Sequence, residues 1–121
     1  MSNVRRVDKP WGHELVWAHT DRYVGKILHI QAGHKLSLQY HEVKEETLYL
    51  QSGTMDLEWF REGDAPEVRR MQPGEVFHVS PRLRHRMTAV TDCDLFEVST
   101  PELGDVVRLE DAYGRKGTKE P

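Results

Sequence analysis

Apolar and polar side chains alternate over many short stretches of this chain, which is the period of a β-strand with one buried and one solvated face. The clearest stretch is YVGKILHI at Tyr23–Ile30, where Val24, Lys26, Leu28 and Ile30 fall on one face. Three of these four side chains are apolar, so we expect that face to be buried. Lys26 would then be a buried cation that needs an anionic partner, and a substrate phosphate is one candidate.

The same alternation recurs in short segments that are closed by glycine, proline or aspartate. The segments that we predict as strands are His13–Trp17, Tyr23–Ile30, Leu36–His41, Thr47–Gln51, Thr54–Arg61, Glu67–Met71, Val76–Val79, His85–Val90 and Leu95–Ser99. Residues 102–115 are predicted to form a strand or a short helical turn. Many short strands at regular spacing indicate an all-β barrel or sandwich.

The length of 121 residues predicts a single domain over residues 1–121, because such a chain can bury a core of its own. Residues 1–10 are polar, and we expect them to form an N-terminal arm that becomes ordered at Trp11. Residues 115–121 follow a glycine and are expected to be a mobile tail. The tryptophans, including Trp17, are expected in the core or at an interface.

The composition narrows the classes of function. The net charge of −3 predicts no basic surface for nucleic acid, and no apolar run is long enough to cross a bilayer. The N-terminus has basic residues but lacks the apolar segment of a secretory signal. Cys93 is the only cysteine, which excludes an internal disulfide and fits a reducing compartment. We therefore expect a cytoplasmic protein that binds a small molecule rather than nucleic acid or a membrane.

Four residues have the types and the spacing of a metal site. Gln39 and His41 are two apart, so on a strand their side chains leave the same face. Glu46 opens the next apolar run, so two neighbouring antiparallel strands would bring it close, and His85 is a fourth candidate downstream. An amide oxygen, two imidazoles and a carboxylate suit a divalent ion with open positions better than a closed structural site. The ion could be Zn, Mn, Fe, Co or Ni.

Two segments match the motif pattern of the cupin barrel. The residues at the spacings of its first motif are Gly33, Gln39, His41, Glu46 and Gly53, with the glutamine in place of the usual first histidine. The second motif places a histidine eleven positions after a glycine, as Gly74 and His85 do. The chain departs from that motif at Ser80, Arg82 and Ala89, where proline, glycine and asparagine are usual.

Among cupins, the chain most resembles the type II phosphomannose isomerase domain, here expected to stand without the nucleotidyltransferase domain that often accompanies it. The matching segments are KPWG at Lys9–Gly12, Val24-Gly25-Lys26, LSLQYH at Leu36–His41 with Glu46 and Ser52-Gly53-Thr54, and VVRLEDAYGR at Val106–Arg115. After the first ligand the family has a run of histidines and an arginine, whereas this chain has Glu42-Val43-Lys44.

The resemblance implies a jelly-roll barrel, also called a double-stranded β-helix, with one divalent ion held by Gln39, His41, Glu46 and His85. It also implies an aldose–ketose isomerase that acts on a sugar phosphate such as mannose 6-phosphate, and a homodimer. The further residues expected at the site are Lys26, Arg108 and Arg115 for phosphate binding and Lys44, Glu45 and Arg108 for catalysis. Two alternatives stay open, a metal-dependent oxygenase of a small organic acid and a non-catalytic sugar or metabolite binder, because one fold hosts many chemistries.

Overall fold

The part of the chain that the structure describes is built of strands. The structure is a computed structural model that describes residues 3–61, 63 and 65–115. The strands are β1 (Arg5–Lys9), β2 (Gly12–His19), β3 (Val24–Ile30), β4 (Leu38–Tyr40), β5 (Glu46–Ser52), β6 (Met55–Phe60), β7 (Glu67–Met71), β8 (Val76–Val79), β9 (Arg84–Ala89), β10 (Cys93–Ser99) and β11 (Val107–Glu110). Of the two possibilities for residues 102–115, the strand is the one that forms. No helix in the described ranges is long and apolar enough to cross a membrane.

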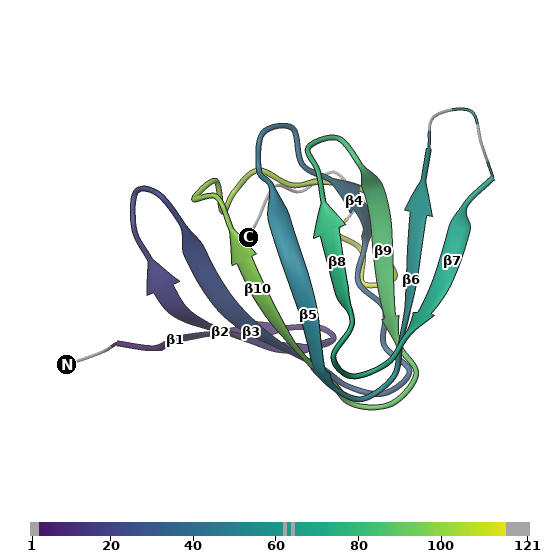
Figure 1. Cartoon of the computed structure of the whole chain (residues 1–121), viewed down its shortest axis with the longest axis horizontal. Coiled ribbons are helices and arrows are strands. Elements are labelled where there is room, and N and C mark those ends of the chain that lie inside the picture. Colours follow the sequence, from purple (N-terminus) through teal and green to yellow (C-terminus); the bar gives the residue numbers. More distant parts are fainter. Residues whose placement is uncertain (1–2, 62, 64, 116–121) are drawn as a thin grey trace.

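The strands form two antiparallel sheets that face each other. One sheet has six strands in the order β1-β2-β3-β10-β5-β8, and the other has five in the order β11-β4-β9-β6-β7. The strands converge at the lower edge in Figure 1 and splay apart toward the upper edge, where the loops 41–45 and 80–83 lie. The all-β barrel prediction is therefore confirmed, with a jelly-roll arrangement that leaves one end open.

The inward-facing side chains make one continuous core. The predicted buried face of β3 is confirmed, because Val24, Lys26, Leu28 and Ile30 are all nearly inaccessible to solvent. Other apolar positions that are buried along alternating registers include Leu48, Leu50, Met55, Leu57 and Leu95. Burial of this apolar surface provides the main driving force for folding.

Two predictions about local structure are wrong. Residues 1–10 were expected to become ordered only at Trp11, but Arg5–Lys9 form β1, which pairs with β2. The turn between them is tight because Gly12 lies against β3, where a Cβ would be 1.9 Å from the carbonyl oxygen of His29. Only glycine allows that approach, and the close turn returns the first residues along the sheet. The expected tail is described only at Arg115, since residues 116–121 lie outside the described ranges.

The second error concerns the strands that carry the candidate ligands. We expected the strand with Gln39 and His41 to pair with the strand that begins at Glu46. Instead β4 pairs with β9 and β11, whereas β5 pairs with β10 and β8 in the opposite sheet. The loop 41–45 crosses between the sheets, because each strand can bury its apolar face only by opposing the other across the core. The candidate ligands therefore meet across the barrel.

Candidate metal centre

Three predicted ligands converge at the open end of the barrel. His41 Nε2 lies 3.2 Å from Glu46 Oε1, and His85 Nε2 lies 3.5 Å from the same oxygen. One ligand atom from each of the three residues falls within 4.8 Å of the others, and all three residues are buried. Glu46 comes from β5, whereas His85 belongs to β9 of the facing sheet, so this triad is assembled by the packing of the two sheets.

Each histidine of the triad is oriented by a backbone carbonyl. His41 Nδ1 donates to the carbonyl oxygen of Asp105 at 2.6 Å, and His85 Nδ1 donates to that of Leu83 at 2.9 Å. A carbonyl can only accept, so the proton of each neutral ring is on Nδ1 and the lone pair is on Nε2. Both lone pairs therefore point toward the Glu46 carboxylate, which is also an acceptor.

This donor set fits a divalent cation. His85 Nε2 is buried without a hydrogen bond in the described part of the chain, although buried polar atoms are normally satisfied. Two imidazole lone pairs and a carboxylate that converge without a donor between them are stabilised by a metal ion or a proton. Gln39 is directly across from His85 in the β4–β9 pair and lines the same cavity, so its amide oxygen is placed to be a fourth ligand.

Asp105 fixes the loop that carries His41. Its carboxylate accepts hydrogen bonds from the backbone N–H groups of Glu42, Val43 and Lys44, at distances of 3.1, 2.7 and 2.9 Å. Burial works to raise the pKa of Asp105, but these three donors lower it overall. The loop is thus held in one conformation by the segment that precedes β11. The sequence contains no local signal for this contact, because the partners are about sixty residues apart.

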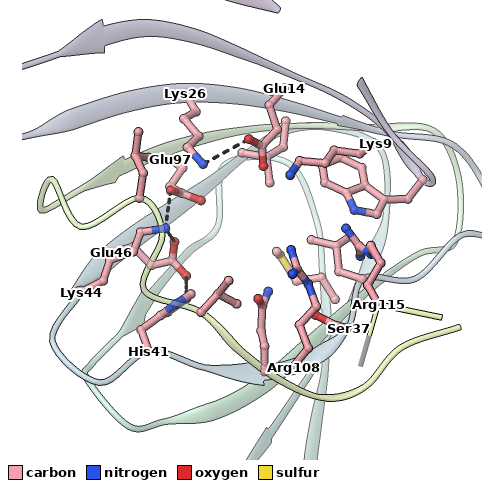
Figure 2. A pocket seen from close by; sticks show the side chains of 17 residues that line it. Lys9, Glu14, Lys26, Ser37, His41, Lys44, Glu46, Glu97, Arg108 and Arg115 are labelled. Carbon is pink, nitrogen blue, oxygen red and sulfur yellow. Dashed lines mark hydrogen bonds and ion pairs between the residues drawn. The ribbon is translucent and has the colours of Figure 1, made fainter. Parts of the chain in front are cut away.

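A chain of buried charged groups continues from the triad. Lys44 Nζ lies 3.3 Å from Glu46 Oε2 and 3.2 Å from Glu97 Oε2 (Figure 2). Lys26 Nζ donates to Glu14 Oε1 at 3.1 Å and is directly across from Glu97 in the β3–β10 pair. Lys26 is a buried cation as predicted, and Glu14 neutralises it. The anionic partner predicted for Lys26 is therefore Glu14 in this structure, and the candidate phosphate is not needed to neutralise it.

The buried carboxyls differ in their affinity for a proton. Burial works to raise the pKa of Glu46, but the Lys44 ammonium holds it well below its usual range. Burial, followed by the nearby Glu46 carboxylate, raises the pKa of Glu97 to about 7 against the opposing effect of Lys44. Burial alone would lower the pKa of Lys44, but Glu97 and Glu46 raise it above its ordinary value. A proton that enters this group therefore resides on Glu97 rather than on Glu46.

A basic side faces the triad across the cavity. Lys9, Arg108 and Arg115 lie across the opening from His41 and Glu46 (Figure 2). Arg115 Nε donates a hydrogen bond to Asp111 Oδ2 at 3.0 Å, and the Arg115 guanidinium lies over the Tyr113 ring. Burial lowers the pKa of Lys9, Glu14 opposes that effect, and the neighbouring cations Lys26, Arg108 and Arg115 lower it further. This side of the cavity favours a negatively charged ligand group.

The cavity is small and opens to solvent. Its volume is about 50 Å³. Apolar side chains such as Leu28, Leu36 and Met87 are also part of its lining. The interior admits the reacting end of a ligand, and the rest of a larger ligand would lie in the mouth.

The structure gathers most of the predicted site residues but not all. His41, Glu46, Gln39, Lys26, Lys44, Arg108 and Arg115 line the cavity, and His85 is buried beside Glu46. Glu45 does not line it, because its exposed carboxylate lies 2.6 Å from His78 Nε2. Glu45 is next to Lys44 in sequence but is not among the cavity residues, so the structure gives its predicted catalytic role no support.

Three charged residues of the cavity were missed by the sequence analysis. Glu14, Glu97 and Lys9 all line the cavity. Glu97 alternates with the buried Leu95 and Ser99 of β10, so an acid at an inward position was the signal that could have identified it. Glu14 alternates with buried Val16 in the same way. Lys9 carried no such signal, because its position depends on the pairing of β1 with β2.

Arg82 shows how the loop before His85 adapts to its sequence. The second cupin motif usually has glycine at the position of Arg82. Arg82 adopts a φ of 69°, which is in the left-handed region that glycine prefers. Its backbone N–H donates to the carbonyl of His41 at 2.6 Å. The backbone conformation is therefore kept although the residue differs.

Comparison with known proteins agrees with this fold. Residues 26–99 match the family description of the cupin domain. KdgF from Halomonas sp. has a similar structure, with a TM-score of 0.67 and 20% identity over 83% of this chain and 88% of that chain. The capsular polysaccharide assembling protein CapF from Staphylococcus aureus matches with a TM-score of 0.73 and 17% identity, over 89% of this chain but 34% of its own.

Oxalate decarboxylase from Lactobacillus farciminis, in a formate complex, gives a TM-score of 0.74 and 17% identity over 88% of this chain and 33% of that chain. At these identities the likeness concerns the fold alone, and the chain spans about a third of the two longer proteins. No curated protein sequence matches it. The family match extends over more than half of the 121 residues and includes His41, Glu46 and His85, and the protein therefore belongs to the cupin family.

Proposed function

We propose that this cupin is a metal-dependent aldose–ketose isomerase that acts on a phosphorylated sugar of the mannose 6-phosphate kind. The observation that carries the proposal is the layout of one cavity. A donor set for a divalent ion and the buried Glu97 carboxyl occupy one side, and Lys9, Arg108 and Arg115 occupy the other. Such a cavity can bind an anionic group at one end and perform proton transfer at the other.

The charges of the cavity favour an anion. The described residues that line it include five cations, Lys9, Lys26, Lys44, Arg108 and Arg115, and three acids, Glu14, Glu46 and Glu97. The formal excess is thus two positive charges, before any metal ion is added. Lys26 and Lys44 each lie within 3.3 Å of a buried carboxylate on the side of the triad, whereas Lys9, Arg108 and Arg115 form the basic side across the cavity, and we assign the phosphate to that side. Arginine is well suited to phosphate because its planar group can donate two parallel hydrogen bonds.

The residues on the other side suit an enediol isomerisation. A divalent ion held by His41, Glu46, His85 and Gln39 would polarise the carbonyl and hydroxyl oxygens of the substrate. Glu97 takes the proton from C2 of the aldose and returns it at C1, while the hydroxyl proton moves from O2 to O1. No oxidant or reductant is needed, because the carbonyl moves along the chain as both protons are transferred. Lys44 stabilises the negative charge on Glu97 when it returns the proton.

The central test is turnover of mannose 6-phosphate to fructose 6-phosphate by protein loaded with each common divalent ion. We expect Glu97→Gln to keep its metal content and to lose at least about 100-fold in kcat, the usual contribution of a general base. His41→Ala should lose stoichiometric metal in elemental analysis. Glu67→Gln, an exposed acid on β7, is the matched control and should behave as the wild type. Absence of turnover with every ion would contradict the proposal.

The narrow interior favours a second candidate, a metal-dependent oxygenase of a small organic acid. A space of about 50 Å³ encloses only a few non-hydrogen atoms, and a two-carbon diacid such as oxalate fits that size better than a whole sugar. Oxygen consumption by Fe(II)-loaded protein with small carboxylic acids, in the absence of isomerase activity, would favour this function. A ligand-dependent rise in melting temperature without any turnover would instead identify a binding protein.

A further inference from the structure

A second cavity lies on the outer face of the five-stranded sheet, and we call it the outer pocket. Its volume is about 410 Å³, within the range of about 300–1,000 Å³ that is usual for small-molecule sites. The charged and aromatic residues of its lining are Tyr40, Glu42, Phe60, Arg61, Arg82 and Arg84. None of these six residues lines the cavity of the metal centre, so the two cavities are separate.

Strand register places an arginine between two aromatic side chains in this pocket. Strands β4, β9 and β6 are neighbours in the five-stranded sheet (Figure 1), and Phe60 on β6 is directly across from Arg84 on β9. Across the other edge of β9, Gln39 is paired with His85. One position along that antiparallel register, Tyr40 is beside Arg84. Successive side chains of a strand point to opposite faces, so these three side chains point away from the metal centre.

Two of the arginines have no acidic partner in the described part of the chain. Arg82 and Arg84 are exposed, and the side chain of neither makes a hydrogen bond or ion pair with another described residue. By contrast, Arg70 on the same outer face donates to Asp56 through Nε at 2.9 Å. The described residues that line the pocket include three arginines and one acid, a formal excess of two positive charges. The outer pocket therefore favours an anion.

The backbone conformation of Arg82 gives a separate indication that its side chain has a role. Its φ of 69° is disfavoured for a residue with a Cβ, whereas glycine adopts it readily. Its backbone N–H donates to the carbonyl oxygen of His41 at 2.6 Å. A glycine would make the same hydrogen bond without strain, so the fold does not require the arginine side chain. Backbone strain at a residue that lines a pocket points to a function of that residue.

Tyr40 and Phe60 provide surfaces for a planar group. Both side chains are half-buried, and neither ring stacks on another ring among the described residues. One strand separates β4 from β6, so the backbones beneath the two rings are about 10 Å apart. A planar group in contact with an aromatic face lies about 3.5–4.0 Å from it, so one flat ring has room between the two side chains. That ring would lie over the guanidinium of Arg84.

This combination indicates a ligand in which an anion is joined to a planar ring. Arginine can donate two parallel hydrogen bonds to a phosphate, and nucleobases stack on aromatic side chains. A nucleoside monophosphate has both parts, and its phosphate carries a charge of about −1.5 to −2 at neutral pH, which matches the excess charge of the pocket. Its ribose hydroxyls can donate to the Glu42 carboxylate, which only accepts when it is ionised. A phosphorylated sugar would leave both aromatic rings uncovered.

We propose that the outer pocket binds a nucleoside monophosphate, with Arg82 and Arg84 on the phosphate and Tyr40 and Phe60 against the base. The inference does not depend on the proposed isomerase activity, because the outer pocket and the cavity of the metal centre share no lining residue.

The test is isothermal titration calorimetry with AMP, and with inorganic phosphate as the anion alone. We expect one AMP per chain, bound more tightly than phosphate. Arg84→Gln should weaken the binding of both by at least about tenfold, because each loses a hydrogen bond to a charged group. Tyr40→Leu should weaken AMP by at least about fivefold through lost stacking and leave phosphate unchanged. Arg70→Gln, an exposed arginine that is already paired with Asp56, is the control and should change neither.

The circular dichroism spectrum and the metal content of each variant establish that it is folded, and Phe60→Leu preserves the test if Tyr40→Leu does not fold. Absence of AMP binding at millimolar concentration would overturn the proposal. So would AMP binding that survives Arg84→Gln, because the nucleotide would then be bound elsewhere. Phosphate binding as tight as that of AMP would also overturn it, because the pocket would then not recognise a ring.

Discussion

The two ends of the barrel interior are built from the same strands but contain opposite chemistry. On β5 the core-facing positions change from Glu46 at the open end to Leu48 and Leu50 toward the closed end. On β10, Glu97 is nearer the open end and Leu95 is nearer the closed end. All of these side chains are buried. The closed end is an ordinary apolar core, whereas the open end contains several charged groups that are nearly as inaccessible to solvent.

This difference indicates that the residues of the open end are suited to a function rather than to stability. Buried ion pairs seldom stabilise a protein more than apolar side chains of the same size would, because removal of charges from water is costly. The closed half therefore provides most of the stability, and the open half depends on it. Charged groups retained at inward positions under those conditions indicate a functional site.

The largest effect that tests this comparison is expected from Lys44→Met. The substitution leaves Glu46 and Glu97 buried without their shared cation, and loss of one partner from a buried ion pair lowers the free energy of unfolding by about 3–5 kcal/mol. Urea denaturation of the metal-free protein at neutral pH measures it. The double variant Lys44→Met/Glu97→Gln should recover much of the loss, since one of the two stranded carboxylates is removed. A loss of less than about 1 kcal/mol would mean that the open end is solvated.

Leu48→Ala tests the closed half and should have the next largest effect. Leu48 is completely buried in the core, so the substitution removes apolar contacts and leaves a cavity. We expect the free energy of unfolding to fall by about 3 kcal/mol. Metal binding by the folded variant should be retained, because the substitution removes none of the candidate ligands. Val68→Ala, at an exposed position on β7, is the control and should change stability by less than about 0.5 kcal/mol.

Cys93 reports whether the closed end is closed in solution. Burial, with the nearby Asp94 and Asp92, raises the pKa of its thiol to about 11 from an ordinary value of 9.0. At pH 8 a maleimide should therefore react about 100-fold more slowly than with the urea-unfolded chain, because only the thiolate attacks. The folded state holds the proton more tightly, so the neutral thiol's contribution to stability should decline as pH rises from 9.0 to about 11. Rapid labelling of the folded protein at pH 8 would contradict a closed end.

The smallest effect is expected from a change in the backbone at the open end. Arg82 at the open end has a φ of 69°, a conformation that is strained for a residue with a Cβ. Arg82→Gly should raise the free energy of unfolding by about 0.5 kcal/mol, since relief of strain is partly offset by the greater freedom of glycine in the unfolded chain. The opposite change at the closed end, Gly53→Ala, should be destabilising, because its Cβ would lie 2.1 Å from the carbonyl oxygen of Asp92. If both changes were neutral, backbone strain would not distinguish the ends.

Much of the framework follows from the sequence, because alternation is a local property. Period two placed Lys26 inside, and every segment predicted as a strand overlaps a strand of the structure. Motif spacing selected His41, Glu46 and His85, which do converge. These inferences succeeded because each depends on residues a few positions apart, or on a spacing typical of a family.

Which residue each buried polar side chain contacts was decided by the tertiary structure. Lys26 pairs with Glu14, and Lys44 pairs with Glu97. The Asp105 carboxylate binds the backbone of the loop that begins at His41. Each contact results from strand pairing or sheet packing. Which sheet receives β4 or β5 depends on how two twisted sheets bury their apolar faces together, and no local pattern encodes that choice. The sequence by itself determined which side chains face inward, and the packing of the sheets determined which of them meet, because contact across a barrel is a property of the whole fold.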